Sequence, residues 1–390
     1  MNIAMDIRVL ATMPRTGVGE YTFELLNAIF LLSPQNTYFL LSSGCKKFFM
    51  PPEWQKPNII LIHLSFSNRL LNILMFLFKW PRLTDWPRLA RWPHLNKKCV
   101  PKFDVLYIPN FNFAPLDPTV KTIVMVHDIS FALFPQFFSW KQRLWHWALR
   151  PKHLLQTADQ IIMPSHNTRR DVIEYFGIEE KKVTTLYPGL CSEFFAPNEA
   201  EIYRVKNKYN LPDNYILFLG TLEPRKNVAA IIYAFQELHR TNALARDLKL
   251  VIAGALGWKN SEVKKMIAAD KHIVSIGYID EKDKHALYKL ARVFVYPSFY
   301  EGFGLPVLEA MATGTPVITS NRSSLVEVAG TAAYLVNPDR IDELVTGLER
   351  FLFDSELHNL YKTRGLVQAQ KFSWERTARE FMTNLISEPN

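Results

Sequence analysis

The second half of the chain alternates apolar and amphipathic segments, and this pattern constrains the fold more than any other feature. Continuous apolar stretches such as YILFLG, LKLVIAG and VFVYPS are typical of strands that are buried on both faces. Each is followed by a segment whose apolar residues recur at helical spacing. The first half repeats the alternation, beginning with IAMDIRVLA and GVGEYTFELLNAIFLL. The sequence therefore predicts an α/β protein with parallel sheets covered by helices.

Length and patterning together indicate two doubly wound domains. A chain of 390 residues is long enough for two well-buried cores. Regular patterning lapses within YPGLCSEFFAPNEAE, where two prolines interrupt it. We therefore expect a first domain over residues 1–195, a second over 196–370, and a final segment at 371–390. In such sheets ligands bind beyond the carboxyl ends of the strands, so the loops that follow strands are where chemistry is expected.

Composition narrows the class of partner and the compartment. The chain carries 46 basic and 37 acidic residues, a net charge of +9, which favours an anionic partner: a nucleotide, a phospholipid surface or a nucleic acid. Three widely spaced cysteines are too few for a disulfide framework or a zinc site, and we expect a cytoplasmic protein. The N-terminal apolar stretch contains Asp6 and Arg8, so it predicts a first strand and not a signal peptide.

Much of the excess charge lies in one segment near residues 66–102, which holds eight Lys/Arg and one acidic residue. Its apolar run, Leu70 to Phe78, is far shorter than the roughly 20 residues that span a bilayer. Trp80, Trp86 and Trp92 follow at six-residue spacing, each before a proline. Two interpretations stay open: an amphipathic helix and loop packed on the first domain, or a peripheral dock on an anionic membrane with these tryptophans in the headgroup region.

Two glutamates eight residues apart bracket a glycine-rich bend in YEGFGLPVLEAMATG. Glu301 falls in the loop after the strand VFVYPS, and Glu309 lies about one turn inside the helix that Pro306 predicts. The N–H groups at Gly304 and Leu305 would then form an anion site at the helix start. Taken alone, the spacing favours Glu301 as a solvated loop residue and Glu309 as a complement to the helix dipole. SLVE, from Ser324, fits a capping box.

Three further strand ends carry candidate residues. GTLEPRKN follows the strand YILFLG and places Arg225 and Lys226 before a helix, where two cations suit a diphosphate or form an ordinary basic turn. MPRTGVGEYTFELL contains Gly17 and is similar to a phosphate-binding turn, although it lacks the dinucleotide glycine spacing. VMVHDISF places His127 and Asp128 after another strand; a lone histidine is more often structural than catalytic.

The order of these motifs resembles the GT-B glycosyltransferases of family 4, the retaining nucleotide-sugar transferases, over essentially the whole chain. GTLEPRKN and YEGFGLPVLEAMATGTPVI carry most of the likeness, and FSWERTAREF resembles the closing helix that crosses back to the first domain. The resemblance implies two Rossmann-like domains facing across a cleft that closes around the donor. Many relatives have an additional arginine where this chain has Thr221, and the Trp/Pro segment has no equivalent that we can align.

The resemblance also implies roles for individual residues. Glu301 and His127 would contact the donor sugar as catalytic residues, and Glu309 would bind the ribose hydroxyls. The remaining donor contacts would be Gly17, Arg225, Lys226, Tyr278, Ile279, Phe303, Gly304 and Leu305. Arg225 and Lys226 would stabilise the leaving diphosphate in place of a metal ion, so no metal site and no cofactor is expected. The departing phosphate would accept the proton of the attacking hydroxyl.

The function we predict is transfer of a hexose onto a glycan or lipid-linked saccharide in cell-surface polysaccharide assembly. GTLEPRKN together with GYID resembles bacterial polysaccharide mannosyltransferases, which makes GDP-mannose the first donor and a UDP-sugar the alternative. Two other classes stay open: a basic nucleic-acid-binding protein, although no nucleic-acid motif accompanies the charge, and a protein that binds or hydrolyses a nucleotide sugar without transfer. We expect no nucleic-acid partner.

Overall fold

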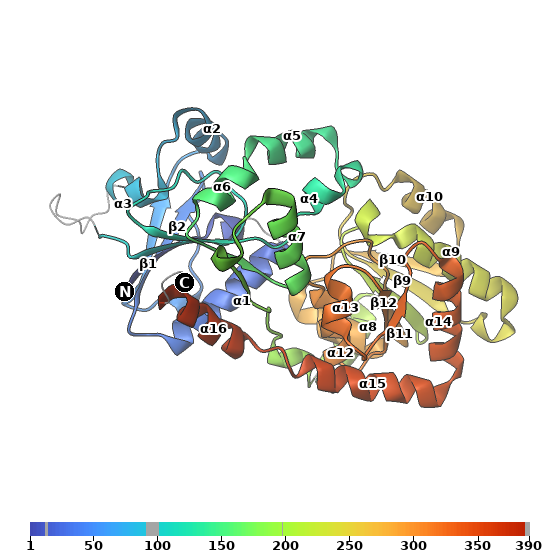
Figure 1. The fold of residues 1–390 in the computed structure, drawn as a ribbon. Helices are drawn as coiled ribbons and strands as arrows, with labels where there is room; N and C mark the ends of the chain where they lie inside the picture. The colour runs from blue at the N-terminus through green and yellow to red at the C-terminus, as the bar shows by residue number, and fades with distance from the viewer. Residues whose placement is uncertain (12–14, 91–100, 197, 387–390) are drawn as a thin grey trace. The chain divides into compact units, whose positions relative to one another are not determined.

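The computed structural model describes residues 1–11, 15–90, 101–196 and 198–386, and within them the chain divides into two compact units (Figure 1). Unit 1 comprises residues 1–129, 141–189 and 374–390, and unit 2 comprises residues 130–140 and 190–373. Trp92 and Cys99 lie outside the described residues. Among the described residues, no helix has both the length and the apolar character needed to cross a bilayer.

Unit 1 is built on a seven-stranded parallel sheet in the order β3-β2-β1-β4-β5-β6-β7. Its strands are β1 (Asn2–Asp6), β2 (Thr37–Ser43), β3 (Ile59–Leu64), β4 (Val105–Ile108), β5 (Lys121–Met125), β6 (Gln160–Met163) and β7 (Val183–Thr185). Its helices are α1 (Gly17–Leu32), α2 (Asn68–Phe78), α3 (Trp86–Leu89), α5 (Trp140–Ala148), α6 (Pro151–Thr157), α7 (His166–Phe176) and α16 (Trp374–Ile386).

Unit 2 is built on a six-stranded parallel sheet in the order β10-β9-β8-β11-β12-β13. Its strands are β8 (Tyr215–Leu219), β9 (Lys249–Ala253), β10 (Ile273–Gly277), β11 (Val293–Tyr296), β12 (Val317–Ser320) and β13 (Tyr334–Val336). Its helices are α4 (Ser130–Leu133), α8 (Glu199–Lys208), α9 (Val228–Thr241), α10 (Ser261–Ala269), α11 (Lys284–Leu290), α12 (Leu305–Ala312), α13 (Ser324–Ala329), α14 (Ile341–Phe353) and α15 (Ser355–Ala369).

The two parallel sheets confirm the predicted α/β class. The central strands β1 and β8 are almost wholly buried, because their continuous apolar sequences leave no face for water. In both sheets the order of the strands reverses beside the first strand. The reversal lies between β1 and β4 in unit 1 and between β8 and β11 in unit 2. These switch points are where ligands of such sheets bind.

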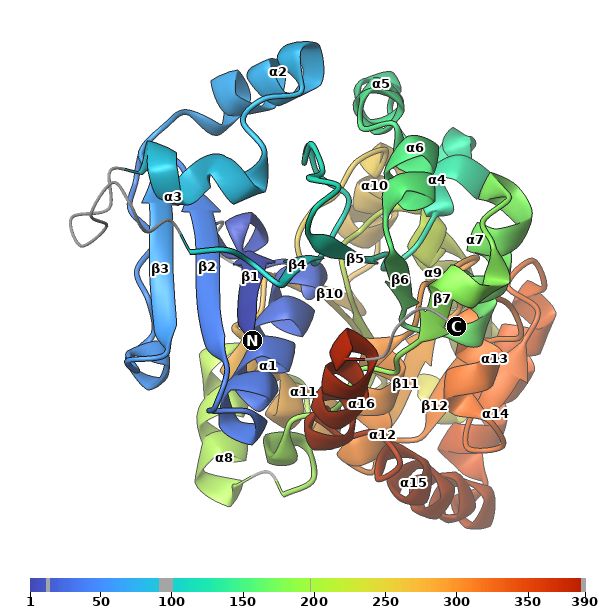
Figure 2. The ribbon, with the colours of Figure 1, turned by 60° about the vertical axis from the view of Figure 1, so that its left-hand side comes forward.

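The last helix, α16, completes the core of unit 1. It packs beside α1, and Figure 2 shows the two helices side by side. Phe381 and Leu385 are buried in the same apolar cluster as strands β1 and β2, and the Phe381 ring meets Tyr107 edge-on at 4.9 Å. The end of the chain therefore folds with residues encoded more than 200 positions earlier.

The segment at residues 130–140 belongs to unit 2, whereas we expected it in the first domain. Two contacts explain this. The indole Nε1 of Trp258 donates a hydrogen bond to the carbonyl of Phe137 at 2.6 Å, and the Phe134 ring packs 5.4 Å from that of Tyr300. Both are side-chain contacts with distant residues, which strand and helix patterning does not encode.

Trp86 does not lie at the surface, so its expected place in a membrane headgroup region is wrong. It is fully buried at the start of α3, with the Arg8 guanidinium 5.6 Å from its ring centroid. Trp80 is 49% exposed. The two tryptophans share a Trp-Pro sequence but differ in position: Trp86 begins a helix packed beside β3, and Trp80 follows the end of α2.

Candidate active site

The loops after β8 and β11 bring the predicted cations and the first glutamate together. These strands are neighbours at the switch point of unit 2, so their carboxyl ends lie side by side. The loop after β8 ends in a short 3-10 turn that contains Arg225 and Lys226, and the loop after β11 contains Glu301. A backbone hydrogen bond from Phe299 N–H to the Arg225 carbonyl, at 2.9 Å, fixes the two loops to each other.

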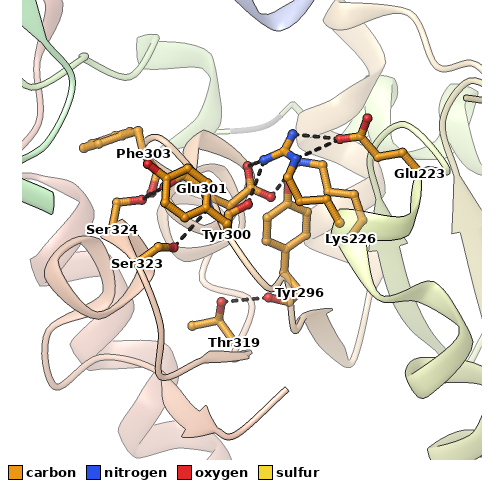
Figure 3. A network of polar contacts seen from close by, with 10 residues as sticks. Glu223, Lys226, Tyr296, Tyr300, Glu301, Phe303, Thr319, Ser323 and Ser324 are labelled. Atoms are coloured by element: carbon orange, nitrogen blue, oxygen red, sulfur yellow. Dashed lines mark hydrogen bonds and ion pairs between the residues drawn. The ribbon is translucent and has the colours of Figure 1, made fainter. Parts of the chain in front are cut away.

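Glu301 is the centre of a buried cluster of charges (Figure 3). Its Oε1 lies 2.7 Å from Lys226 Nζ, and its Oε2 lies 2.7 Å from Arg225 Nη1. Glu223 holds the far side of the Arg225 guanidinium, with Oε1 2.7 Å from Nη2. Lys226 Nζ also donates a hydrogen bond to the Tyr296 hydroxyl. The four charged side chains give a net charge of zero, which lowers the cost of burying them.

Charge pairing sets the protonation state of the cluster. Burial alone would raise the pKa of Glu301, but the adjacent Arg225 and Lys226 outweigh it and lower that pKa from 4.5 to about 2. The pKa of Lys226 is lowered, chiefly by burial and then by the charge of Arg225. Glu301 is therefore a carboxylate at neutral pH and not a solvated loop residue; only 7% of it is exposed.

The loop that carries Glu301 is held by two serines. The backbone N–H of Glu301 donates to Ser323 Oγ at 3.0 Å. Ser324 Oγ donates to the carbonyls of Glu301 and Phe303, at 2.8 and 2.6 Å (Figure 3). Ser323 has φ +53, an uncommon backbone conformation for a residue with a Cβ. The serines position the carboxylate through the backbone.

The capping box expected at Ser324 is wrong. Helix α13 has Ser323 as its N-cap, without a side-chain cap hydrogen bond, and the Ser324 hydroxyl is used by the glutamate loop. Sequence reasoning therefore missed Ser324 as a residue of the site. The capping-box motif predicts only a local hydrogen bond for Ser324. It gives no information about the carbonyls of Glu301 and Phe303, which lie more than 20 positions earlier in the sequence.

Helix α12 begins as its sequence predicts. Pro306 lies in its first turn, and Gly304 precedes it with φ +123, a conformation that a residue with a Cβ rarely adopts. A Cβ at Gly304 would also lie 2.7 Å from a Leu325 methyl group. The helix ends before Gly314, which has φ +77. Gly304 and Leu305 thus place the first N–H groups of α12 at the end of the Glu301 loop.

Glu309 lies inside α12 and is 8% exposed. Its Oε2 accepts a hydrogen bond from the Tyr288 hydroxyl at 2.7 Å. Burial raises the pKa of Glu309, and the nearby Lys284 opposes the shift. The two glutamates therefore have different environments. Glu301 pairs with two cations, whereas the hydrogen-bond partner of Glu309 is a tyrosine hydroxyl, which leaves Glu309 suited to neutral donors such as sugar hydroxyls.

The other predicted donor contacts in unit 2 differ in accessibility. Phe303 is buried and meets Phe372 at 5.7 Å between ring centroids, so its backbone and not its ring is available to a ligand. Tyr278 is 43% exposed directly after β10, and the neighbouring Ile279 is buried. Only Tyr278 of these two presents a large accessible face.

Gly17 and His127 belong to unit 1. Gly17 is the first residue of α1; among the described residues, apart from its chain neighbours and the backbone of its own helix, none has a heavy atom within 4 Å of where its Cβ would be. His127 follows β5, and its Nε2 lies 2.9 Å from the Pro109 carbonyl. Burial lowers the pKa of His127 to about 4. Because a carbonyl only accepts, Nε2 carries the proton of this neutral ring, and Nδ1 is the hydrogen-bond acceptor.

Unit 1 contains a polar cavity of about 250 Å³ at its own switch point. It is lined by Asp6 at the end of β1, by Arg8 and Asn110, which follow β1 and β4, and by Asn72 of α2 and Trp145 of α5. Arg8 and Asp6 form a buried ion pair at 2.6 Å. Amide groups beside an indole ring provide both hydrogen bonds and a flat apolar surface for a hydroxylated ligand. Sequence reasoning did not identify this cavity.

Comparison with known proteins defines the class to which this fold and this site belong. The family described as Glycosyl transferases group 1 matches residues 199–366, and Glycosyltransferase Family 4 matches residues 55–194. The solved structure of Anabaena Alr3699/HepE in complex with UDP and glucose superposes with a TM-score of 0.74, at 16% identity, over 99% of this chain and 100% of that one. WaaG, a glycosyltransferase involved in lipopolysaccharide biosynthesis, gives a TM-score of 0.69 at 16% identity, over 99% and 100%.

The chain is therefore a family 4 glycosyltransferase of GT-B fold. It is 31% identical to the O-antigen chain mannosyltransferase B of Escherichia coli over 93% of both chains. It is also 30% identical to the MMP alpha-(1->4)-mannosyltransferase of Mycolicibacterium hassiacum, over 59% of this chain and 54% of that protein. The resemblance seen in the motifs thus extends along nearly the whole sequence.

Proposed function

We propose that this glycosyltransferase moves mannose from GDP-mannose, with retention of configuration, onto a lipid-linked saccharide in cell-surface polysaccharide assembly. The similarity to the O-antigen chain mannosyltransferase B over nearly the full length supports the sugar and the process. The observation that carries the chemistry is the buried cluster around Glu301, which holds one carboxylate between two cations at a switch point.

Donor binding exchanges partners within this cluster. In the structure, Arg225 and Lys226 are neutralised by Glu223 and Glu301. A diphosphate offers more negative oxygens to the same N–H groups, so it competes for both cations. Release from these pairs lets the Glu301 carboxylate turn toward the sugar. The donor thereby creates the arrangement in which an anionic leaving group and a cationic sugar carbon each have a charged partner.

The remaining roles follow from the environments of the side chains. Glu309 accepts hydrogen bonds from the ribose hydroxyls, and Tyr278 lies against the base. Phe303, Gly304 and Leu305 present their backbone groups to the sugar and the phosphates, and Ile279 supports Tyr278 from the buried side. Gly17 contributes an N–H to the phosphates, and neutral His127 accepts a hydrogen bond from the sugar at Nδ1. No metal and no cofactor takes part.

The transfer step breaks the bond between the sugar C1 and the diphosphate oxygen and forms one between C1 and the acceptor hydroxyl oxygen. The acceptor attacks on the face that the diphosphate leaves, and its proton passes to the departing phosphate. Arg225 and Lys226 stabilise the charge that develops on the diphosphate. Exclusion of water from the donor site would prevent hydrolysis.

The saccharide end of the acceptor binds in the polar cavity at the β1–β4 switch point of unit 1. Its amides and the Trp145 ring suit a sugar face, and the buried Asp6–Arg8 pair gives it a fixed polar wall. The chain acts at the inner face of a membrane through the exposed side of α2. Leu70, Ile73 and Leu77 recur at helical spacing there and are between 47% and 62% exposed.

Thermal unfolding with a panel of nucleotides and nucleotide sugars tests the donor. A ligand present at 100 times its dissociation constant stabilises the fold by roughly 2.7 kcal/mol. At one common concentration the tighter ligand gives the larger shift, so GDP-mannose should raise the midpoint more than any UDP-sugar. Radiolabelled mannose transfer into a lipid-linked saccharide extract, with NMR of the new anomeric proton, then tests transfer and retention. A larger shift with a UDP-sugar would replace GDP-mannose by that donor. Release of free mannose without transfer would make the protein a hydrolase.

A further inference from the structure

Unit 1 contains a second cavity, of about 220 Å³, which the proposed donor and saccharide sites do not use. It lies between α2, residues 112–116 and the junction of α5 with α6. Its apolar wall includes Met75, Leu149 and Leu154, each of which is at least nine-tenths buried. Buried apolar side chains therefore form part of the cavity wall.

Basic side chains line the same cavity. Lys79, Arg82, Arg150 and His153 are all exposed, and among the described residues that line the cavity none is acidic. The Arg82 guanidinium forms a long ion pair with Asp117, at 3.9 Å, and 47% of the Arg82 side chain stays exposed. The recess thus combines a buried apolar wall with a cationic edge, and this combination matches an anionic head joined to an apolar chain.

Two of these cations occupy helix ends with unusual backbone conformations. Lys79 terminates α2 with φ +51, and Arg150 links α5 to α6 with φ +49. Both values are in the left-handed region, which residues with a Cβ rarely occupy. The Arg150 guanidinium lies 5.6 Å from the Phe76 ring centroid, at the wall of the cavity. Both side chains therefore project from the ends of helices.

The surface around the cavity is apolar on both helices. On α2, Leu77 and Phe78 are 62% and 68% exposed, and on α5 Trp147 is 70% exposed. No residue of α5 is buried, although the helix carries three tryptophans. Phe113 joins the two helices beneath this surface, with its ring 6.0 Å from Phe76 and 5.0 Å from Trp145. Figures 1 and 2 show α2 and α5 as the elements that frame this side of unit 1.

We propose that this cavity binds the phosphate and the first carbons of a lipid phosphate. The cations hold the phosphate, the buried wall takes the first carbons, and the exposed apolar residues continue the path of the chain. Its volume is smaller than the roughly 300–1,000 Å³ of pockets for drug-sized molecules, so it holds the junction between head and chain and not a whole lipid. The proposal depends on the proposed function in one respect only, which is the identity of the lipid that carries the phosphate.

The position of the cavity relates it to the acceptor. Asn112 lines both this cavity and the polar cavity at the β1–β4 switch point. A saccharide bound in the polar cavity and joined to a lipid through a phosphate would therefore have that phosphate beside Lys79 and Arg150. A bilayer phospholipid offers the same phosphate-and-chain chemistry, and the experiment below separates the two sources.

The probe is dodecyl phosphate below its critical micelle concentration. Its binding is measured by isothermal titration calorimetry in the absence of any nucleotide. We expect one molecule to bind, with inorganic phosphate and dodecyl maltoside at least about tenfold weaker because each lacks one half of the ligand. The double variant K79N/R150N should bind at least about tenfold more weakly, since two charge-assisted contacts are lost. Asparagine tolerates the left-handed conformation, so both helix ends should keep their geometry.

Lys152→Asn is the matched control, because Lys152 is an exposed cation on α6 outside the cavity, and it should bind the probe as the unaltered chain does. Ala148→Phe, which fills the cavity from α5, should abolish binding while thermal unfolding stays cooperative. Three results would overturn the proposal: equal binding of dodecyl phosphate by all variants, binding of many dodecyl phosphate molecules per chain, or an equal affinity of the unaltered chain for dodecyl maltoside.

Two further arms identify the source of the lipid. Preferential binding of a short polyprenyl phosphate over a phosphatidylglycerol of similar chain length assigns the site to the acceptor, and the reverse assigns it to the bilayer. Glu309→Gln should bind dodecyl phosphate normally, because its change is confined to unit 2. Unchanged donor binding and transfer in this variant would count against the proposed donor chemistry and leave the lipid site standing, whereas loss of dodecyl phosphate binding would count against the lipid site.

Discussion

Replacing Glu301 by glutamine tests the charge cluster most directly, because it removes one charge and keeps the shape of the side chain. Glu301 pairs with Arg225 and Lys226 at 2.7 Å each and is 7% exposed. The substitution leaves two buried cations with Glu223 as the remaining carboxylate of the cluster. Removing one member of a buried pair typically costs about 3–5 kcal/mol, since the other charge stays buried without its partner.

The pKa of Glu301 gives an independent magnitude. Lowering it from 4.5 to about 2 corresponds to about 3 kcal/mol of stabilisation at neutral pH. A carboxyl group whose folded-state pKa is depressed stabilises the fold fully above its ordinary pKa. That contribution is lost as the pH falls from about 4.5 toward about 2, and about half is lost by roughly pH 3. The stability difference between the unaltered chain and E301Q should shrink over that window.

Urea unfolding at several pH values between 7 and 3 measures this difference. Glu223→Gln is the control for kinetics, because it produces the same net charge in the cluster without removing the carboxylate proposed to reach the sugar. We expect E301Q to lower turnover far more than E223Q does, and to bind GDP at least as tightly as the unaltered chain. A stability difference that is small and independent of pH would refute the electrostatic reasoning. Wild-type turnover in E301Q would refute the role at the sugar.

The remaining predictions concern the donor, the loop, the absence of a metal and the membrane. Glu309→Gln should weaken donor binding by about 1.5–3 kcal/mol in titration calorimetry, as expected for charge-assisted hydrogen bonds, whereas Tyr288→Phe, which keeps the carboxylate, should weaken it less. Ser324→Ala leaves two carbonyls without their side-chain donor, so turnover should fall, and the unfolding free energy should drop by about 1–3 kcal/mol. EDTA should leave transfer unchanged; activity restored only by manganese or magnesium would contradict this. Serine at Leu77 and Phe78 should abolish flotation with phosphatidylglycerol vesicles at low salt, and flotation as before would exclude α2 as the dock.

The fold could be predicted from the sequence because burial on both faces leaves a simple signal. Continuous apolar strands such as Tyr215–Leu219 and Val293–Tyr296 have few alternatives to the centre of a parallel sheet. The rule that ligands bind beyond the carboxyl ends of such strands indicated the loops after them. The resemblance to family 4 glycosyltransferases then assigned Arg225 and Glu301, which are 76 positions apart, to one site, and the structure brings the two side chains together.

What the sequence could not reveal is which side chains face each other across elements. Trp80 and Trp86 have the same local sequence, yet Trp86 is fully buried and Trp80 is half exposed. The difference depends on where the chain runs after α2, and no local pattern records it. Helix α5 carries three tryptophans, but it buries none of its residues. A pattern of apolar spacing indicates a face and does not say whether another element covers it.

The pairing within the charge cluster is the clearest case of information that only the structure supplies. Sequence reasoning treated Arg225 and Lys226 as a preformed substitute for a metal ion, and Glu301 as a separate sugar contact. Two buried cations without counter-charges would be costly, and in the structure Glu301 and Glu223 supply those charges. The cations are thus held in position at zero net charge. Under the proposed function the diphosphate would have to compete for them, so its affinity would be lower than two unpaired cations would give. The carboxylate that leaves the pair would then become available when the leaving group has arrived, which would couple the charge at the sugar to the presence of the diphosphate.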